Sequence, residues 1–186
     1  MTLTLAGKNV AILAANGFDE NQMTEIQRAL TKAKATVRTI APEQGVVNGW
    51  QGDGWGHYFP VDAQIGQALG SDFDMLVLPG GERAVTKLKT NPHARRIVTH
   101  FLEAGKPITA IGAGVSLLAL CPLIAGRTVA ASPDAQDELK AVGAVISEMP
   151  QEIDGTILTA NGDDIKAWVD EAMEFFGDAE LIRQAA

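Results

Sequence analysis

The chain has 186 residues, which suits a single domain (1–186) that buries about 70% of its unfolded surface without disulfides or metals. A formal net charge of −8 and a pI near 4.8, with no basic cluster, argue against a nucleic-acid partner. No run reaches the roughly 18 apolar residues of a membrane span and no segment has the pattern of a signal peptide. We therefore expect a cytoplasmic protein with no membrane partner, and the single cysteine, Cys121, fits a reducing compartment.

Strand-like and helix-like segments alternate along the chain. Residues Asn9–Ala14 form a short apolar run that predicts a buried parallel strand. Apolar residues at helical spacing then predict a helix over Asp19–Lys34. Further strands are expected at Thr36–Ala41, Asp74–Leu78, Ile108–Ile111, Ala144–Ile146 and Thr156–Thr159, and further helices from Asn91-Pro92 to Gly105, over Asp134–Val142 and over Asp164–Phe176.

This alternation predicts an α/β fold, with a doubly wound, mostly parallel sheet sandwiched by helices. Ligands of such sheets bind at the carboxyl ends of the strands. The loops that matter most therefore begin at Asn16, Gly80 and Gly112. The segment Gly45–Val61 is rich in glycine and aromatic residues, and it predicts a small hairpin or flap inserted into this fold.

The turn Ala110–Gly114 (A-I-G-A-G) connects an apolar strand to the apolar, helix-like run Val115–Leu120. Many α/β enzymes hold a nucleophile on a sharp turn of this kind, beside the free N–H groups of the following helix. The residue at the apex here is Gly112, which has no side chain.

Three segments resemble the ThiJ/PfpI superfamily: A-A-N-G-F-D-E at Ala14–Glu20, D-F-D-M-L-V-L-P-G-G at Asp72–Gly81, and E-A-G-K-P-I-T-A-I-G-A-G at Glu103–Gly114. They occur in the order and at the spacing of that family. The resemblance implies its flavodoxin-like, class I glutamine amidotransferase-like fold over nearly the whole chain.

The family's catalytic residues do not carry over. Its enzymes usually have a cysteine followed by a histidine at the turn, and a glutamate on the first helix. These positions fall on Gly112, Ala113 and Gln22. No backbone group replaces a thiolate as a nucleophile, and an amide exchanges no proton near neutral pH. We therefore predict a degenerate active site without cysteine chemistry.

A small anion-friendly pocket is expected to survive at the turn. Backbone N–H groups near a helix N-terminus and in the neighbouring glycine loop favour negative charge. The expected ligand-binding residues are Gly80, Gly81, Gly112, Ala113, Gly114 and Gln22.

Other chemical side chains offer weaker candidates. Asp19 and Glu20 stand where carboxylates stabilise the start of a helix, and they are the first candidates for any acid–base chemistry. Ser116 lies one turn past Gly112 without a histidine nearby in sequence. Cys121 lies nine residues past Gly112, and we interpret it as a small core residue.

The three histidines show no metal-ligand spacing, so neither a metal nor a cofactor is expected. His57 lies within the flap, which could cover the pocket or bury its aromatic residues against a second subunit; we favour the subunit contact. We interpret His93 and His100 as surface residues, and we expect a homodimer.

Two functions follow. The leading hypothesis is a non-catalytic domain that binds a small molecule or serves as a structural or regulatory module, similar to the C-terminal domain of large-subunit catalases. The alternative is a cysteine-independent hydrolase or lyase (peptidase, amidase, glyoxalase or deglycase). In that case Asp19 or Glu20 would activate water, and the Gly81 and Ala113 amides would hold the developing charge.

Overall fold

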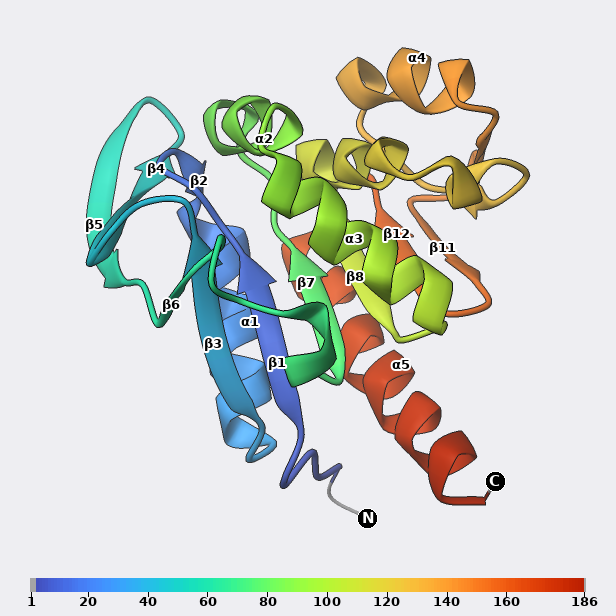
Figure 1. Ribbon diagram of the computed structural model, residues 1–186. Helices are drawn as coiled ribbons and strands as arrows, with labels where there is room; N and C mark the ends of the chain where they lie inside the picture. The colour runs from blue at the N-terminus through green and yellow to red at the C-terminus, as the bar shows by residue number, and fades with distance from the viewer. Residues whose placement is uncertain (1–2, 186) are drawn as a thin grey trace.

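A seven-stranded sheet forms the centre of the computed structural model, which describes residues 3–185 (Figure 1). The strands follow the order β11-β12-β8-β7-β1-β3-β6. Their bounds are β1 (Asn9–Leu13), β3 (Thr36–Ala41), β6 (Ala63–Gln64), β7 (Met75–Leu78), β8 (Ile108–Ile111), β11 (Gln151–Asp154) and β12 (Ile157–Ala160).

Every pair in this sheet is parallel except β11–β12, which is antiparallel. The five central strands are β3, β1, β7, β8 and β12, which correspond to a chain order of 2-1-3-4-5. That order is the flavodoxin-like one, so the predicted α/β fold is confirmed. It also places a topological switch point between β1 and β7, where a crevice opens at the carboxyl ends of the strands.

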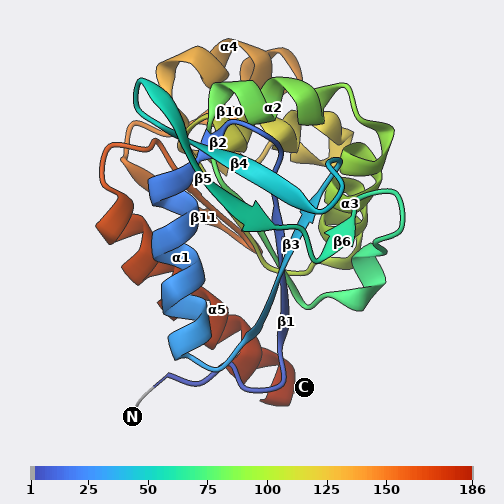
Figure 2. The ribbon, with the colours of Figure 1, turned by 90° about the vertical axis from the view of Figure 1, so that its left-hand side faces the viewer.

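Helices cover both faces of the sheet. Helices α1 (Glu20–Lys32) and α5 (Ile165–Ala185) lie on one face, and α3 (Pro92–Ala104) lies on the other (Figure 2). Near the carboxyl ends of the strands lie α2 (Glu82–Lys89), α4 (Pro133–Ala141) and the 3-10 helix η2 (Gly112–Leu120). Two shorter 3-10 helices are η1 (Gly70–Asp72) and η3 (Pro122–Ile124).

Local sequence signals account for several of these boundaries. Asn91 accepts a hydrogen bond from the His93 amide at 2.9 Å, and Pro92 occupies the first turn, so α3 begins there. The helix ends at Gly105, whose φ of 61° is left-handed. The buried Trp168 ties α5 to the sheet, because its Nε1 donates to Thr109 Oγ1 at 2.8 Å.

Three of the differences from the sequence predictions concern the helices and the edge of the fold. The closing helix, expected to end at Phe176, continues to Ala185. Helix α2 follows the glycine loop directly and was not predicted. The expected strand Ala144–Ile146 is β10 (Val145–Ile146), which pairs with β9 (Thr128–Val129) outside the main sheet.

The expected hairpin is confirmed. Strands β4 (Val46–Gln51) and β5 (Gly54–Pro60) are antiparallel, and β2 (Phe18–Asp19) pairs with β4 to complete a small sheet. Phe59 packs edge-on against the buried Phe18, with ring centroids 5.2 Å apart. The hairpin is therefore joined to the loop that follows β1.

Across residues 3–185, the helices are all too short or too polar to cross a bilayer.

Candidate functional site

The turn after β8 has the geometry of a nucleophile-bearing turn. Gly112 is buried, and its φ of 58° lies in the left-handed region. A Cβ added there would meet only the side-chain amide nitrogen of Gln22, at 3.5 Å. The turn therefore has space for a side chain, and glycine adopts its backbone conformation without the penalty that other residues incur. The helix that follows is a 3-10 helix.

Gln22 fills the centre of this site. Its side chain is buried, and its Oε1 accepts a hydrogen bond from the Gly80 amide at 2.7 Å. Its Nε2 lies on the side of Gly112. Gln22 thereby joins α1 to the loops after β7 and β8. These expected loops do lie together in the structure. The Gly80 N–H, which was expected to face a bound anion, instead donates to Gln22.

Gly81 and Gly114 are required by close backbone packing. A Cβ at Gly81 would lie 2.5 Å from the Gly17 carbonyl oxygen, and one at Gly114 would lie 2.4 Å from the Leu78 carbonyl oxygen. Gly162, in the loop after β12, also packs near the Gly112 Cα. Sequence reasoning did not place this fourth loop at the site, since Gly162 lies far from the other motifs along the chain.

Ser116 and Cys121 are both buried. The Ser116 hydroxyl donates to the Ala113 carbonyl oxygen at 2.7 Å, and the side chain is buried. Ala113 and Ser116 line a pocket of about 160 Å³ between η2, α2 and the start of α4. Cys121 is buried just past the far end of η2.

The two carboxylates at the start of α1 have different partners. Asp19 is the N-cap of α1 and accepts a hydrogen bond from the Gln22 amide at 3.0 Å. Glu20 does not share this capping role. It is buried under the hairpin, where its Oε1 contacts His57 Nδ1 at 2.5 Å and Gln51 Nε2 at 2.8 Å, and its Oε2 accepts from the His57 amide at 2.8 Å.

These contacts control the ionisation of Glu20. Burial raises the pKa of its carboxyl, but the hydrogen bonds from His57 and Gln51 outweigh that effect and lower the pKa below its ordinary value. Glu20 therefore remains a carboxylate whose oxygens are used by the hairpin. Both carboxylates thus already accept hydrogen bonds from the protein.

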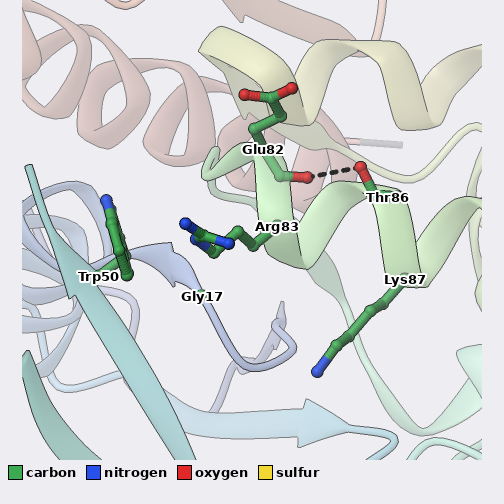
Figure 3. Close-up of a pocket in the computed structure, with 6 residues that line it drawn as sticks. All are labelled: Gly17, Trp50, Glu82, Arg83, Thr86 and Lys87. Carbon is green, nitrogen blue, oxygen red and sulfur yellow. Dashed lines mark hydrogen bonds between the residues drawn. The ribbon is translucent and has the colours of Figure 1, made fainter. Parts of the chain in front are cut away.

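Sequence reasoning missed two side-chain groupings. The first is the Glu20 contact with the hairpin, which joins residues 37 positions apart. The second is a pocket of about 560 Å³ at the start of α2, lined by Gly17, Trp50, Glu82, Arg83, Thr86 and Lys87 (Figure 3). The missed helix explains the second omission. The pattern Ala84, Val85, Leu88, with Glu82 first and Lys89 last, was the available signal.

The histidines lie apart from one another. His57 is 78% exposed and His93 is exposed, whereas His100 is partly buried. Burial and the nearby Lys106 ammonium lower the pKa of His100. Within residues 3–185, no three His, Cys, Asp or Glu side chains are grouped to hold a metal ion.

Comparison with known proteins identifies the relatives of this chain. The model of the DJ-1/PfpI family matches residues 8–175. The chain is 28% identical to protein/nucleic acid deglycase 2 of Escherichia coli over 173 residues, which cover 91% of this chain and 98% of that protein. It is 32% identical to catalase HPII of Mycobacterium avium over 115 residues, 62% of this chain but only 16% of the catalase.

A solved structure supports the same fold. A two-domain protein from Anabaena variabilis, with DJ-1/ThiJ/PfpI-like and ferritin-like domains, superposes with a TM-score of 0.84 at 23% identity. The match covers 91% of this chain and 48% of that one. The expected resemblance to the ThiJ/PfpI superfamily is confirmed.

Proposed function

This chain belongs to the DJ-1/PfpI family, and we propose that it is a member without catalytic chemistry at the turn after β8, acting as a module that binds a small molecule. The family scaffold is retained, because Gln22 joins α1 to the loops after β7 and β8. What differs is the set of groups that would react.

One observation carries the proposal. Acyl-transfer chemistry at such a turn needs a nucleophile and free N–H donors for the developing oxyanion. Gly112 provides no nucleophile, and the Gly80 N–H is already bonded to Gln22 Oε1 at 2.7 Å. A neutral amide therefore occupies this N–H donor. This arrangement suits a structural role for the turn better than catalysis.

The names of relatives point toward chemistry, since curated relatives from Escherichia coli and Thermococcus kodakarensis are called deglycases. A cysteine-independent version of such a reaction would need another base at the turn. Asp19 caps a helix and Glu20 is bonded under the hairpin. We therefore favour binding over hydrolase or lyase activity.

The decisive experiment measures turnover of glyoxals, peptides and amides by the purified wild-type protein. We expect no turnover above the buffer rate. Cys121→Ser, which removes the only thiol, serves as the matched control and should change nothing. Turnover at an enzyme-like rate that Gly112→Ala or Gln22→Ala abolishes would contradict the proposal.

A gain-of-function variant tests the interpretation of the turn itself. In the Cys121→Ser background, the combination Gly112→Cys with Gln22→Glu places a thiol beside a carboxyl. We expect this thiol to react with iodoacetamide much faster than the buried Cys121 of the wild type. A thiol no more reactive than Cys121 would show that the turn does not expose its apex.

A further inference from the structure

We propose that the pocket formed by Trp50, Arg83 and Lys87 binds a small organic dicarboxylate. This proposal rests on the proposed function in one respect, namely that the chain is a binding module. The site itself is separate from the turn at Gly112. We call it the Trp50–Arg83 pocket, and its remaining lining residues are Gly17, Glu82 and Thr86.

The position of the pocket in the fold favours ligand binding. Gly17 follows β1, and Glu82–Lys87 follow β7. These two strands flank the switch point of the sheet, and doubly wound sheets bind their ligands in the crevice that opens there. Strand β4 of the hairpin supplies Trp50 as the outer wall (Figure 3).

Arg83 is held in place but is left with free donors. Its guanidinium carbon lies 4.2 Å from the centroid of the Trp50 ring, a cation–π contact. The Trp50 ring is itself fixed, because its Nε1 donates to the Gly52 carbonyl oxygen at 2.8 Å. Among the described residues, no hydrogen bond or ion pair engages the guanidinium.

Gly17 makes room for this arginine. A Cβ at Gly17 would lie 2.5 Å from the Arg83 Cβ, so a side chain there would displace the arginine stem. An ordered guanidinium with unused N–H groups matches a carboxylate through two parallel hydrogen bonds. The stacking contact already orients the arginine, so carboxylate binding costs little side-chain entropy.

Lys87 supplies a second cation at a separate point. It lies one turn after Arg83 on the same helix, and its side chain points in a different direction from that of Arg83 (Figure 3). Its Nζ is 3.5 Å from Glu43 Oε1, an oxygen that also accepts from the Asn16 amide at 2.9 Å. The lysine is half exposed and this contact is long, so it leaves the ammonium able to reach a ligand.

Two separated cations favour two separated anionic groups over one compact anion. This is why we infer a dicarboxylate and not inorganic phosphate. The Glu82 carboxylate belongs to the same pocket, but it points away from the guanidinium (Figure 3). Its negative charge opposes the ligand, so removing that charge is a direct test of the electrostatic argument.

The experiment titrates the purified full-length protein with succinate at low salt and follows binding by calorimetry and tryptophan fluorescence. Acetate and inorganic phosphate are the comparison probes. We expect succinate to bind with a dissociation constant of about 1 mM or below, more tightly than acetate or phosphate. Binding should also change the tryptophan fluorescence, and this change should be absent in Trp50→Phe.

The variants assign the roles within the pocket. Arg83→Gln should weaken succinate binding by roughly tenfold or more, and Lys87→Gln should weaken succinate but leave acetate unchanged. Glu82→Gln should strengthen succinate binding. Arg95→Gln, which removes an exposed arginine of α3, is the matched control for net charge and should have no effect.

Several outcomes would overturn the proposal: no succinate binding, tighter binding of phosphate than of succinate, or equal losses in Arg83→Gln and Arg95→Gln. None of these outcomes involves turnover. If one of these binding results is obtained and the protein shows no turnover, only this inference is contradicted. If the protein shows turnover that depends on Gly112, the proposed function is contradicted.

Discussion

Gly112 and Gln22 form a matched pair at the centre of the fold. A buried carboxylate at position 22 with no thiol beside it would be a costly unpaired charge. The amide avoids that cost and satisfies the buried Gly80 N–H at 2.7 Å. The glycine removes the strain that any other residue would incur at a φ of 58°. The two residues therefore suit each other at this turn.

The first prediction concerns the backbone at this turn. Gly112→Ala should destabilise the protein by about 1–2 kcal/mol, the cost of placing a Cβ in the left-handed region. Steric conflict adds little, because the nearest atom to the new Cβ is 3.5 Å away. Urea unfolding followed by circular dichroism measures the change.

Gly105→Ala is the matched control for that prediction. Gly105 has a φ of 61° and no neighbour within 4 Å of an added Cβ, so it isolates the backbone cost. The two alanine variants should lose similar amounts of stability. A much larger loss at Gly112 would show that the turn has no room for a side chain.

Sequence reasoning identified the turn but not that the Gly80 N–H is already hydrogen-bonded to a side chain. The strand, the glycine loop and the resemblance together located Gly112, Gln22 and Gly80 at one point. The hydrogen bond between Gln22 and Gly80 spans 58 positions of sequence. Such a pairing depends on side-chain orientation, and neither periodicity nor composition contains that information.

The hairpin is attached to α1 through Glu20. A Cβ at Gly49 or at Gly56 would lie 2.5 Å or 1.8 Å from Glu20 Oε2, so both strands require glycine above the carboxylate. Together with the bonds to His57 and Gln51, this enclosure makes Glu20 a structural anchor. It also holds β4, and therefore Trp50, against the loop after β1.

The second prediction follows from the lowered pKa of Glu20. A carboxyl whose pKa is lower in the folded state stabilises the protein when the pH is above the pKa of the unfolded state, near 4.5. This stabilisation is lost as the pH falls through the pKa of the folded state. Glu20→Gln should therefore lower the unfolding free energy by about 1–3 kcal/mol at pH 7. The difference from wild type should shrink below pH 4.5.

Thermal unfolding of both proteins between neutral and acidic pH tests this. Glu25→Gln serves as the control, because Glu25 is exposed on the same helix and, among the described residues, forms a surface pair with Arg28. A surface pair of this kind contributes little. A Glu20→Gln variant that follows the wild-type curve at every pH would rule out the anchoring role.

At the element scale, buried strands were the easiest features to predict. Continuous apolar runs such as Asn9–Leu13 and Met75–Leu78 are typical of strands covered on both faces. Helix α2 was missed because it has only eight residues and its N-cap, Gly81, offers no side-chain cap. Two-residue strands such as β2 and β6 carry no periodicity and depend on their neighbours.

For the whole molecule, the strand order explains why two different sites lie at one edge of the sheet. The turn at Gly112 follows β8, while the Trp50–Arg83 pocket opens at the switch point between β1 and β7. The residues that line the pocket do not include Gly112 or Gln22. The overall charge of −8 opposes anion binding at long range, so affinity at the pocket depends on Arg83 and Lys87 at short range.

The last prediction concerns association of two copies of the chain. On the hairpin, Trp55 and Tyr58 are 56% and 70% exposed, and Val46 is 49% exposed. Strand β5 is also the free edge of its small sheet. Exposed aromatic residues on an unpaired edge strand promote association, and we expect a homodimer through this surface.

Light scattering after size-exclusion chromatography should give twice the mass of the 19.6 kDa chain. The double variant Trp55→Ser, Tyr58→Ser should have half that mass. Its chains should still unfold cooperatively, as a folded monomer does. Leu123→Ser with Met149→Ser, two exposed apolar residues outside the hairpin, is the control and should remain dimeric. A monomeric wild type, or a dimer that survives the hairpin changes, would exclude this interface.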